Sequence, residues 1–115
     1  MSEMIYHMCP AEAWEAAVAA GRYNGIADNR RDGFIHFSTA AQLPESARRH
    51  RSGQQGLVLV AVAAGRLGER LRWEPSRGGA LFPHLYGPLF PDEAAEVVPL
   101  PLGPDGEHVF PPLRV

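Results

Sequence analysis

Hydrophobic and polar positions alternate most regularly along residues 33–39 (GFIHFST), and the pattern predicts a strand there. Side chains two residues apart on a strand share a face, so Ile35 and Phe37 make one face apolar. His36 and Ser38 lie on the opposite face, where an imidazole and a hydroxyl are typical of a strand that borders a cleft. A strand histidine can also be a hydrogen-bonded structural residue, so the pattern supports both interpretations.

The chain before this segment predicts one strand and one helix. Residues 4–8 are short, aromatic and apolar, as in a strand, and they include His7. Residues 11–20 are rich in strong helix formers, and Gly21 is a natural stop for that helix. Residues 22–32 are polar and contain glycine, which predicts a connecting loop.

A second helix and a buried strand are predicted after the central segment. Thr39 and Gln42 have the spacing of a capping box, which indicates a helix over residues 40–51. Residues 57–62 are continuously apolar and of strand length, so we expect a central strand that is buried on both faces.

The rest of the chain reads mainly as strands and turns. Residues 65–74 predict a loop or helical turn that leads into a short strand. Residues 97–100 predict an edge strand, because Pro99 lies within it and Pro101 follows it. Residues 81–89 place His84 and Tyr86 on one face if extended, although the prolines argue against a central strand. This aromatic segment is a second candidate wall for a site.

Two N-terminal strand-helix units followed by mostly strands predict an α+β fold. A length of 115 residues fits a single compact domain, residues 1–115. The net charge of −2 gives no general attraction to nucleic acid or to anionic membranes, so neither is an expected partner. The pattern says nothing about the oligomeric state.

Composition also limits the chemistry. The chain has no lysine, which excludes Schiff-base and P-loop mechanisms that need one. Cys9 is the only cysteine, which excludes an internal disulfide, and no segment approaches the roughly 20 apolar residues of a membrane span. The first eight residues lack the features of a signal peptide, so we expect a cytoplasmic protein.

Three histidines lie in apolar, aromatic segments: His7, His36 and His84. Three imidazoles can ligate zinc with water in the fourth position, but the spacing provides no anchoring pair, so no metal is expected and zinc is kept as an alternative. Neither a nucleophile elbow nor a glycine-rich phosphate loop is present.

Segments 33–39 (GFIHFST) and 82–89 (FPHLYGPL) resemble those of DUF952, an uncharacterised bacterial domain family. The strand with His7, the helix after it and segment 33–39 also resemble the catalytic domain of the NAD-dependent RNA 2'-phosphotransferases. That resemblance implies an ADP-ribosyltransferase-like fold, a cleft for NAD or a related nucleotide, and transfer of ADP-ribose.

The same resemblance implies roles for individual residues. His36 and Ser38 would line the nicotinamide pocket as the catalytic residues, and His7 would contact the ribose or amide of NAD. We add Tyr23 or Tyr86 as a stacking partner and His84 as a further ligand-binding residue. The alternative is a non-catalytic domain that binds a small ligand or a partner in the same cleft.

Overall fold

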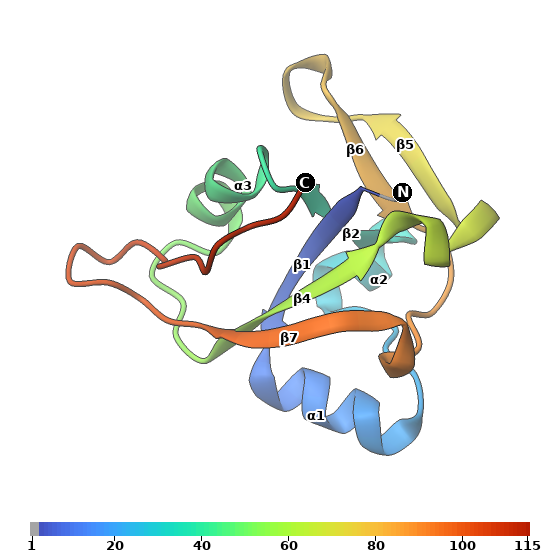
Figure 1. Cartoon of the computed structure of the whole chain (residues 1–115), viewed down its shortest axis with the longest axis horizontal. Helices are drawn as coiled ribbons and strands as arrows, with labels where there is room; N and C mark the ends of the chain where they lie inside the picture. The colour runs from blue at the N-terminus through green and yellow to red at the C-terminus, as the bar shows by residue number, and fades with distance from the viewer. Residues whose placement is uncertain (1–2) are drawn as a thin grey trace.

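The computed structural model describes residues 3–115 (Figure 1). The strands are β1 (Met4–Pro10), β2 (Ile35–His36), β3 (Ser38–Thr39), β4 (Leu57–Ala63), β5 (Leu71–Pro75), β6 (Leu81–Leu85) and β7 (Ala94–Leu100). The α-helices are α1 (Ala11–Ala20), α2 (Ala27–Asp32) and α3 (Leu43–His50). The short 3-10 turns are η1 (Ala64–Arg66), η2 (Gly68–Arg70), η3 (Arg77–Gly79) and η4 (Pro91–Glu93).

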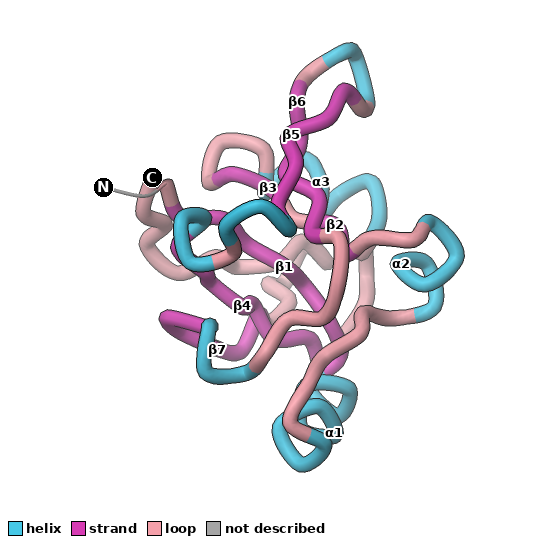
Figure 2. Tube along the Cα trace, turned by 90° about the vertical axis from the view of Figure 1, so that its right-hand side faces the viewer, coloured by secondary structure: helices cyan, strands magenta, loops and turns pink. Residues whose placement is uncertain are grey.

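Two antiparallel sheets form the compact α+β fold. The larger sheet has the order β3-β1-β4-β7, and the smaller one has the order β2-β6-β5. The hairpin of β5 and β6 projects from the rest of the molecule (Figures 1 and 2). The predicted α+β class is therefore confirmed.

The larger sheet is buried on both faces at its centre. Ile5 and Cys9 of β1 pack in one core cluster with Trp14 of α1. Tyr6 of β1 packs on the opposite face in a second cluster with Leu43 of α3. The prediction of a fully buried central strand over residues 57–62 is confirmed, because β4 lies between β1 and β7.

The central segment 33–39 passes from one sheet to the other. Its first half, β2, pairs with β6, and its second half, β3, pairs with β1. Phe37 lies between them, and its backbone N–H donates a hydrogen bond of 3.0 Å to the carbonyl of Pro83. The prediction of a single strand is therefore corrected to two short ones, while the buried face of Ile35 and Phe37 is confirmed.

The helices agree with the prediction except at two points. Helix α1 has the predicted bounds and ends at Gly21. The reciprocal hydrogen bonds of the predicted capping box form, since Thr39 Oγ1 accepts from the N–H of Gln42 at 3.2 Å, and Gln42 Oε1 accepts from the N–H of Thr39 at 3.0 Å. They close a turn that precedes the helix, so the helix predicted over residues 40–51 is corrected to Leu43–His50. Helix α2 replaces part of the loop predicted over residues 22–32.

Strand β6 is the central strand of the smaller sheet, so the argument from its prolines was wrong. The carbonyl of Pro83 points toward Phe37, and in an antiparallel strand the nitrogen of a residue points to the same side as its carbonyl. The nitrogen of Pro83 therefore points toward Phe37 and away from β5, so its missing N–H removes no hydrogen bond between β6 and β5.

Within residues 3–115, none of the helices is both long enough and apolar enough to cross a membrane.

Candidate functional site

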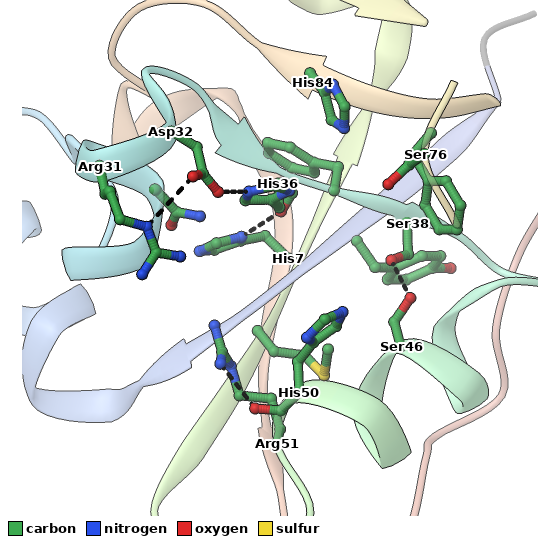
Figure 3. A pocket seen from close by; sticks show the side chains of 15 residues that line it. His7, Arg31, Asp32, His36, Ser38, Ser46, His50, Arg51, Ser76 and His84 are labelled. Carbon is green, nitrogen blue, oxygen red and sulfur yellow. Dashed lines mark hydrogen bonds and ion pairs between the residues drawn. The ribbon is translucent and has the colours of Figure 1, made fainter. Parts of the chain in front are cut away.

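A pocket with both polar and apolar lining lies where β1, α2, the end of α3 and the crossing segment, residues 33–39, meet (Figure 3). Its volume is about 210 Å³. The lining side chains come from five parts of the chain: Tyr6, His7, Met8, Asn29, Arg31, Asp32, His36, Phe37, Ser38, Ser46, His50, Arg51, Ser76, Phe82 and His84.

His7 forms the back of the pocket and is fully engaged by the protein. Its Nδ1 lies 2.6 Å from the carbonyl oxygen of His36, and its Nε2 lies 2.7 Å from the hydroxyl of Tyr23. A carbonyl can only accept, so Nδ1–H donates to His36 and Nε2 accepts from Tyr23. Burial lowers the pKa of His7 from 6.5 to about 4, and the imidazole is therefore neutral at pH 7.

Tyr23 lies behind His7, outside the pocket lining. Its side chain is buried, and burial is the main cause that raises its pKa. Burial also raises the pKa of neighbouring Cys9 to about 11, so the thiol stays protonated. Tyr23 fixes the ring of His7, and His7 in turn fixes the backbone of His36.

His36 lies on the wall of the pocket and pairs with Asp32. Its Nε2 is 2.7 Å from Asp32 Oδ2, four residues earlier, across the turn at Gly33. The hydrogen bond from His36 lowers the pKa of Asp32. The carboxylate accepts from Nε2–H, so Nδ1 is the ring nitrogen that this pair does not use.

Ser38 lies deeper than His36. Its hydroxyl donates a hydrogen bond of 2.8 Å to the hydroxyl of Ser46 on α3, and both side chains are buried. Ser38 thus connects β3 to α3 at the floor of the pocket.

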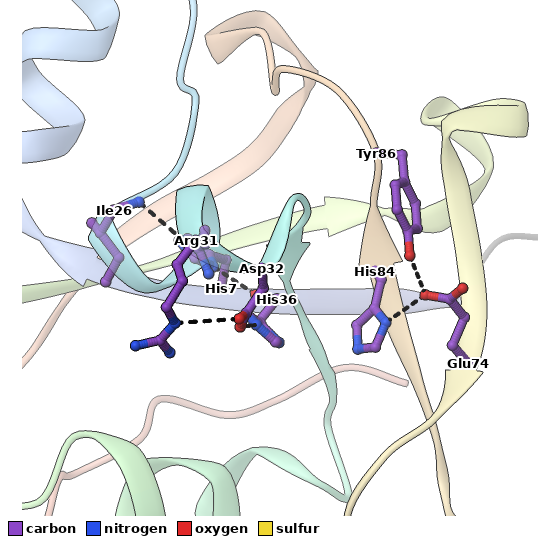
Figure 4. Close-up of polar contacts among 9 residues, drawn as sticks. His7, Ile26, Arg31, Asp32, His36, Glu74, His84 and Tyr86 are labelled. Carbon is purple, nitrogen blue, oxygen red and sulfur yellow. Dashed lines mark hydrogen bonds and ion pairs between the residues drawn. The ribbon is translucent and has the colours of Figure 1, made fainter.

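His84 faces His36 across the β2–β6 pair, with its ring centre 5.3 Å from that of His36. Its Nδ1 donates to Glu74 Oε1 at 2.8 Å, and the hydroxyl of Tyr86 donates to the same oxygen at 2.7 Å (Figure 4). These two hydrogen bonds, the one from Tyr86 first, lower the pKa of Glu74. Phe34 stacks on His84 with ring centres 4.0 Å apart.

Positive charge lies on the side of the pocket near His7. Arg31 of α2 and Arg51, just after α3, both line the pocket there (Figure 3). Arg31 also contacts Asp32 at 3.4 Å, and Arg51 donates to the carbonyl of His50 at 2.9 Å. The pocket thus combines imidazole and aromatic groups with two guanidinium groups, which suit a planar ring and an anion respectively.

The predicted site residues fall into two groups. His7, His36, Ser38 and His84 are brought together in the pocket lining, whereas Tyr23 and Tyr86 are not part of it. Their roles as ligand or catalytic residues stay predictions. In the described part of the chain, no group of three or more His, Cys, Asp or Glu side chains is arranged to hold a metal ion.

The sequence interpretation missed the contribution of α2. Asn29 and Asp32 line the pocket, but both lie in the segment predicted as a loop. One signal for Asp32 was available, because an acidic residue four positions before a histidine can reach it across a turn.

The fold and the pocket define a small α+β protein with a pocket beside the segment that connects its two antiparallel sheets. Residues 8–97 match the family described as Protein of unknown function (DUF952), which covers most of the chain. The chain therefore belongs to the DUF952 family. No curated protein matches it.

Solved structures of one bacterial protein agree with this assignment. The crystal structure of CC0527 from Caulobacter crescentus is 47% identical, covers 92% of this chain and 93% of that chain, and has a TM-score of 0.89. The solution NMR structure of CC0527 is 48% identical, covers 90% of each chain and has a TM-score of 0.82.

Proposed function

We propose that the pocket binds NAD or a related nucleotide in an ADP-ribosyltransferase-like cleft, and that the protein transfers ADP-ribose. One observation carries the proposal: a single pocket joins an imidazole and aromatic wall, formed by His36 and His84, to the two guanidinium groups of Arg31 and Arg51. A nucleotide presents the matching combination of a flat ring, a sugar and phosphates.

The size of the pocket fits one end of a dinucleotide. Its volume of about 210 Å³ is below the roughly 300–1,000 Å³ of sites that enclose a drug-sized ligand. We therefore place one ring and its ribose inside, and the phosphates toward Arg31 and Arg51. When bound, NAD would supply the ADP-ribosyl group and nicotinamide as the leaving group.

The residues of the chain would orient the sugar and exclude water. Asp32 occupies His36 Nε2, so Nδ1 would be the ring nitrogen that hydrogen-bonds a ribose hydroxyl. The main chain of His36 is held by His7, so this nitrogen sits on a fixed backbone. Ser38 forms the floor, and Phe82 and His84 give the lining ring-bearing side chains against which a ligand ring can pack.

The second candidate is non-catalytic binding in the same pocket, and the carboxylates favour it. Asp32 is bonded to His36, and Glu74 is bonded to both His84 and Tyr86. These carboxylates set the tautomers of two histidines, and neither is free to stabilise a developing positive charge on a sugar.

Calorimetric titration with NAD tests the binding step. We expect saturable binding to the wild type and at least tenfold weaker binding to His36→Ala, while the matched variant His108→Ala, outside this pocket, binds as the wild type does. Absence of heat at millimolar NAD, or equal binding by both variants, would overturn the proposal. Nicotinamide release is then measured for the wild type and for His36→Ala. More release by the wild type indicates transfer of ADP-ribose, and equal release indicates binding alone.

A further inference from the structure

We propose that β5 is a self-association edge, which pairs antiparallel with β5 of a second copy of this chain and places Trp73 opposite Trp73. This inference goes beyond the proposed function and does not depend on it. Three observations carry it: the edge position of β5, the exposed Trp73 at its centre, and charges on either side that complement themselves in one register.

Strand β5 lies at the edge of the smaller sheet, in the hairpin that projects from the rest of the molecule (Figures 1 and 2). Trp73 is opposite Pro83 of β6, whose carbonyl points away from β5 and accepts from the N–H of Phe37. In an antiparallel pair, the backbone N–H and C=O of Trp73 therefore point away from β6, toward the outer edge. Groups in this position can hydrogen-bond another strand.

The N–H of Trp73 limits how a second β5 can pair. Leu71 and Pro75 face the same edge, but the N–H of Leu71 donates to the carbonyl of Gly68 and Pro75 has no N–H. Between Leu71 and Pro75, Trp73 thus supplies the donor for an added strand. Two copies of β5 can use it in three antiparallel registers, with Trp73 opposite Leu71, Trp73 or Pro75 of the second copy.

The charges of β5 select one of these registers. Arg72 and Glu74 flank Trp73 and share the opposite face of the strand. With Trp73 opposite Trp73, Arg72 of each copy faces Glu74 of the other. The other two registers place Arg72 opposite Arg72 or Glu74 opposite Glu74, and like charges directly opposite one another are destabilising.

Both charged side chains can form this pair. Arg72 is exposed, and the Glu74 side chain is 35 % exposed. The hydrogen bonds that Glu74 accepts from His84 and Tyr86 both use Oε1, so Oε2 can accept from an arginine of the second copy.

The other face of the hairpin supplies apolar area for the contact. Trp73 is 38 % exposed, and Leu81, on the same face and opposite Pro75, is 52 % exposed. Pairing of two copies brings the Trp73 side chains side by side and covers part of this apolar surface. Because the paired strands are short, we expect a weak dimer whose population depends on concentration.

Sedimentation of the full chain, from micromolar to millimolar concentration, tests the edge. We expect a reversible monomer–dimer equilibrium that Trp73→Lys weakens by about tenfold or more. The matched control is Val97→Lys, because Val97 is also 38 % exposed and lies on β7, an edge strand of the larger sheet. This control should associate as the wild type does.

Charge reversal tests the register. Arg72→Glu gives the edge two acidic side chains and Glu74→Arg gives it two basic ones, so each variant alone should dimerise about tenfold more weakly than the wild type. An equimolar mixture of the two variants restores both opposite-charge pairs and should form a heterodimer at least as tight as the wild-type dimer. If Glu74→Arg does not fold, Arg72→Glu decides, because Arg72 is exposed.

A monomer at millimolar concentration, or a dimer that Trp73→Lys leaves intact, would overturn the proposal. A dimer lost in Val97→Lys alone would place the contact at β7 and would overturn it as well. If Arg72→Glu dimerises as the wild type does, or if the two folded variants gain nothing on mixing, the register is wrong and the proposal fails.

Discussion

His7 shows how one residue joins the core to the pocket. Its ring is buried against Tyr23 and Phe37, and its two nitrogens bind the hydroxyl of Tyr23 and the carbonyl of His36. A neutral histidine in this position is a positioning residue. It holds the backbone of the crossing segment through the carbonyl of His36, so the backbone position that carries the His36 side chain is fixed.

Burial of His7 predicts a pH-dependent stability. Its pKa is about 4 in the folded protein and near 6.5 when exposed, so the unfolded chain binds the proton more readily between these values. Stability is therefore complete above pH 6.5 and falls as the pH drops toward 4. We expect a loss of about 2 kcal/mol from His7 between pH 7.5 and pH 5, measured by urea unfolding.

The variant His7→Gln isolates this contribution. It should be less stable than the wild type at pH 7.5 but should lose about 2 kcal/mol less than the wild type on going to pH 5. The control His108→Gln, whose half-buried histidine lies near the C-terminus, should keep the loss of the wild type. Equal losses in wild type and His7→Gln would show that His7 does not titrate as its burial implies.

Residue types alone predicted part of the site. His36, Ser38 and His84 could be assigned to the lining of a cleft, because they are polar residues within predominantly apolar strands. The role of His7 as an internal hydrogen-bonding group could not be predicted, because it depends on Tyr23, which lies sixteen residues away in the sequence. The sequence left both interpretations of a strand histidine open; in the structure both nitrogens of His7 are bonded within the protein, and His36 lines the pocket.

Helix α2 is the element that the hydrophobic pattern could not predict. It has six residues, mostly polar, so no apolar period identifies it. It forms because Asn29 Oδ1 accepts the N–H of Ile26 at its start, and Gly33 ends it with a φ of 86°. This short helix supplies Asn29, Arg31 and Asp32 to the pocket, so missing it also meant missing one wall.

Gly25, just before α2, predicts a second measurable effect. Its φ is +87°, and a Cβ there would lie 2.6 Å from the Cβ of Asn29. Gly21 has a similar φ of +84° with nothing within 4 Å, so it is the matched control. In urea unfolding, Gly25→Ala should cost about 1–3 kcal/mol more than Gly21→Ala, because only the first adds a clash to backbone strain.

Equal costs for these two variants would mean that Asn29 is not packed against Gly25. Because the clash would displace Asn29, Gly25→Ala should also weaken ligand binding, whereas Gly21→Ala should not.

The hydrophobic pattern also could not predict that the crossing segment changes from one sheet to the other. Strands β2 and β3 are separated by Phe37 alone, and the alternation of apolar and polar residues in the sequence continues from Ile35 to Ser38. The change of sheet is therefore invisible in the sequence, because it depends on which strand pairs with each half. It matters for the site, since it places His36 opposite His84 and Ser38 opposite Tyr6 of β1.

The whole molecule combines a four-stranded sheet, whose central strands β1 and β4 are buried, with a smaller sheet that projects beside it (Figure 2). The α+β class and the buried β4 followed from sequence, because long apolar runs and helix stops are local signals. The strand order did not, since it depends on long-range pairing such as that of β1 with β4. The 47% identity to CC0527 over 92% of the chain supports the same arrangement.

Chemical-shift mapping of the isotope-labelled protein with NAD tests the nucleotide pocket most directly. The account predicts that saturable shifts concentrate on the pocket, at Asn29, His36, Ser38 and His84, and spare the separate groove between α3 and the C-terminal segment, which contains Arg48. Absence of shifts at millimolar NAD, or shifts confined to that groove, would contradict it.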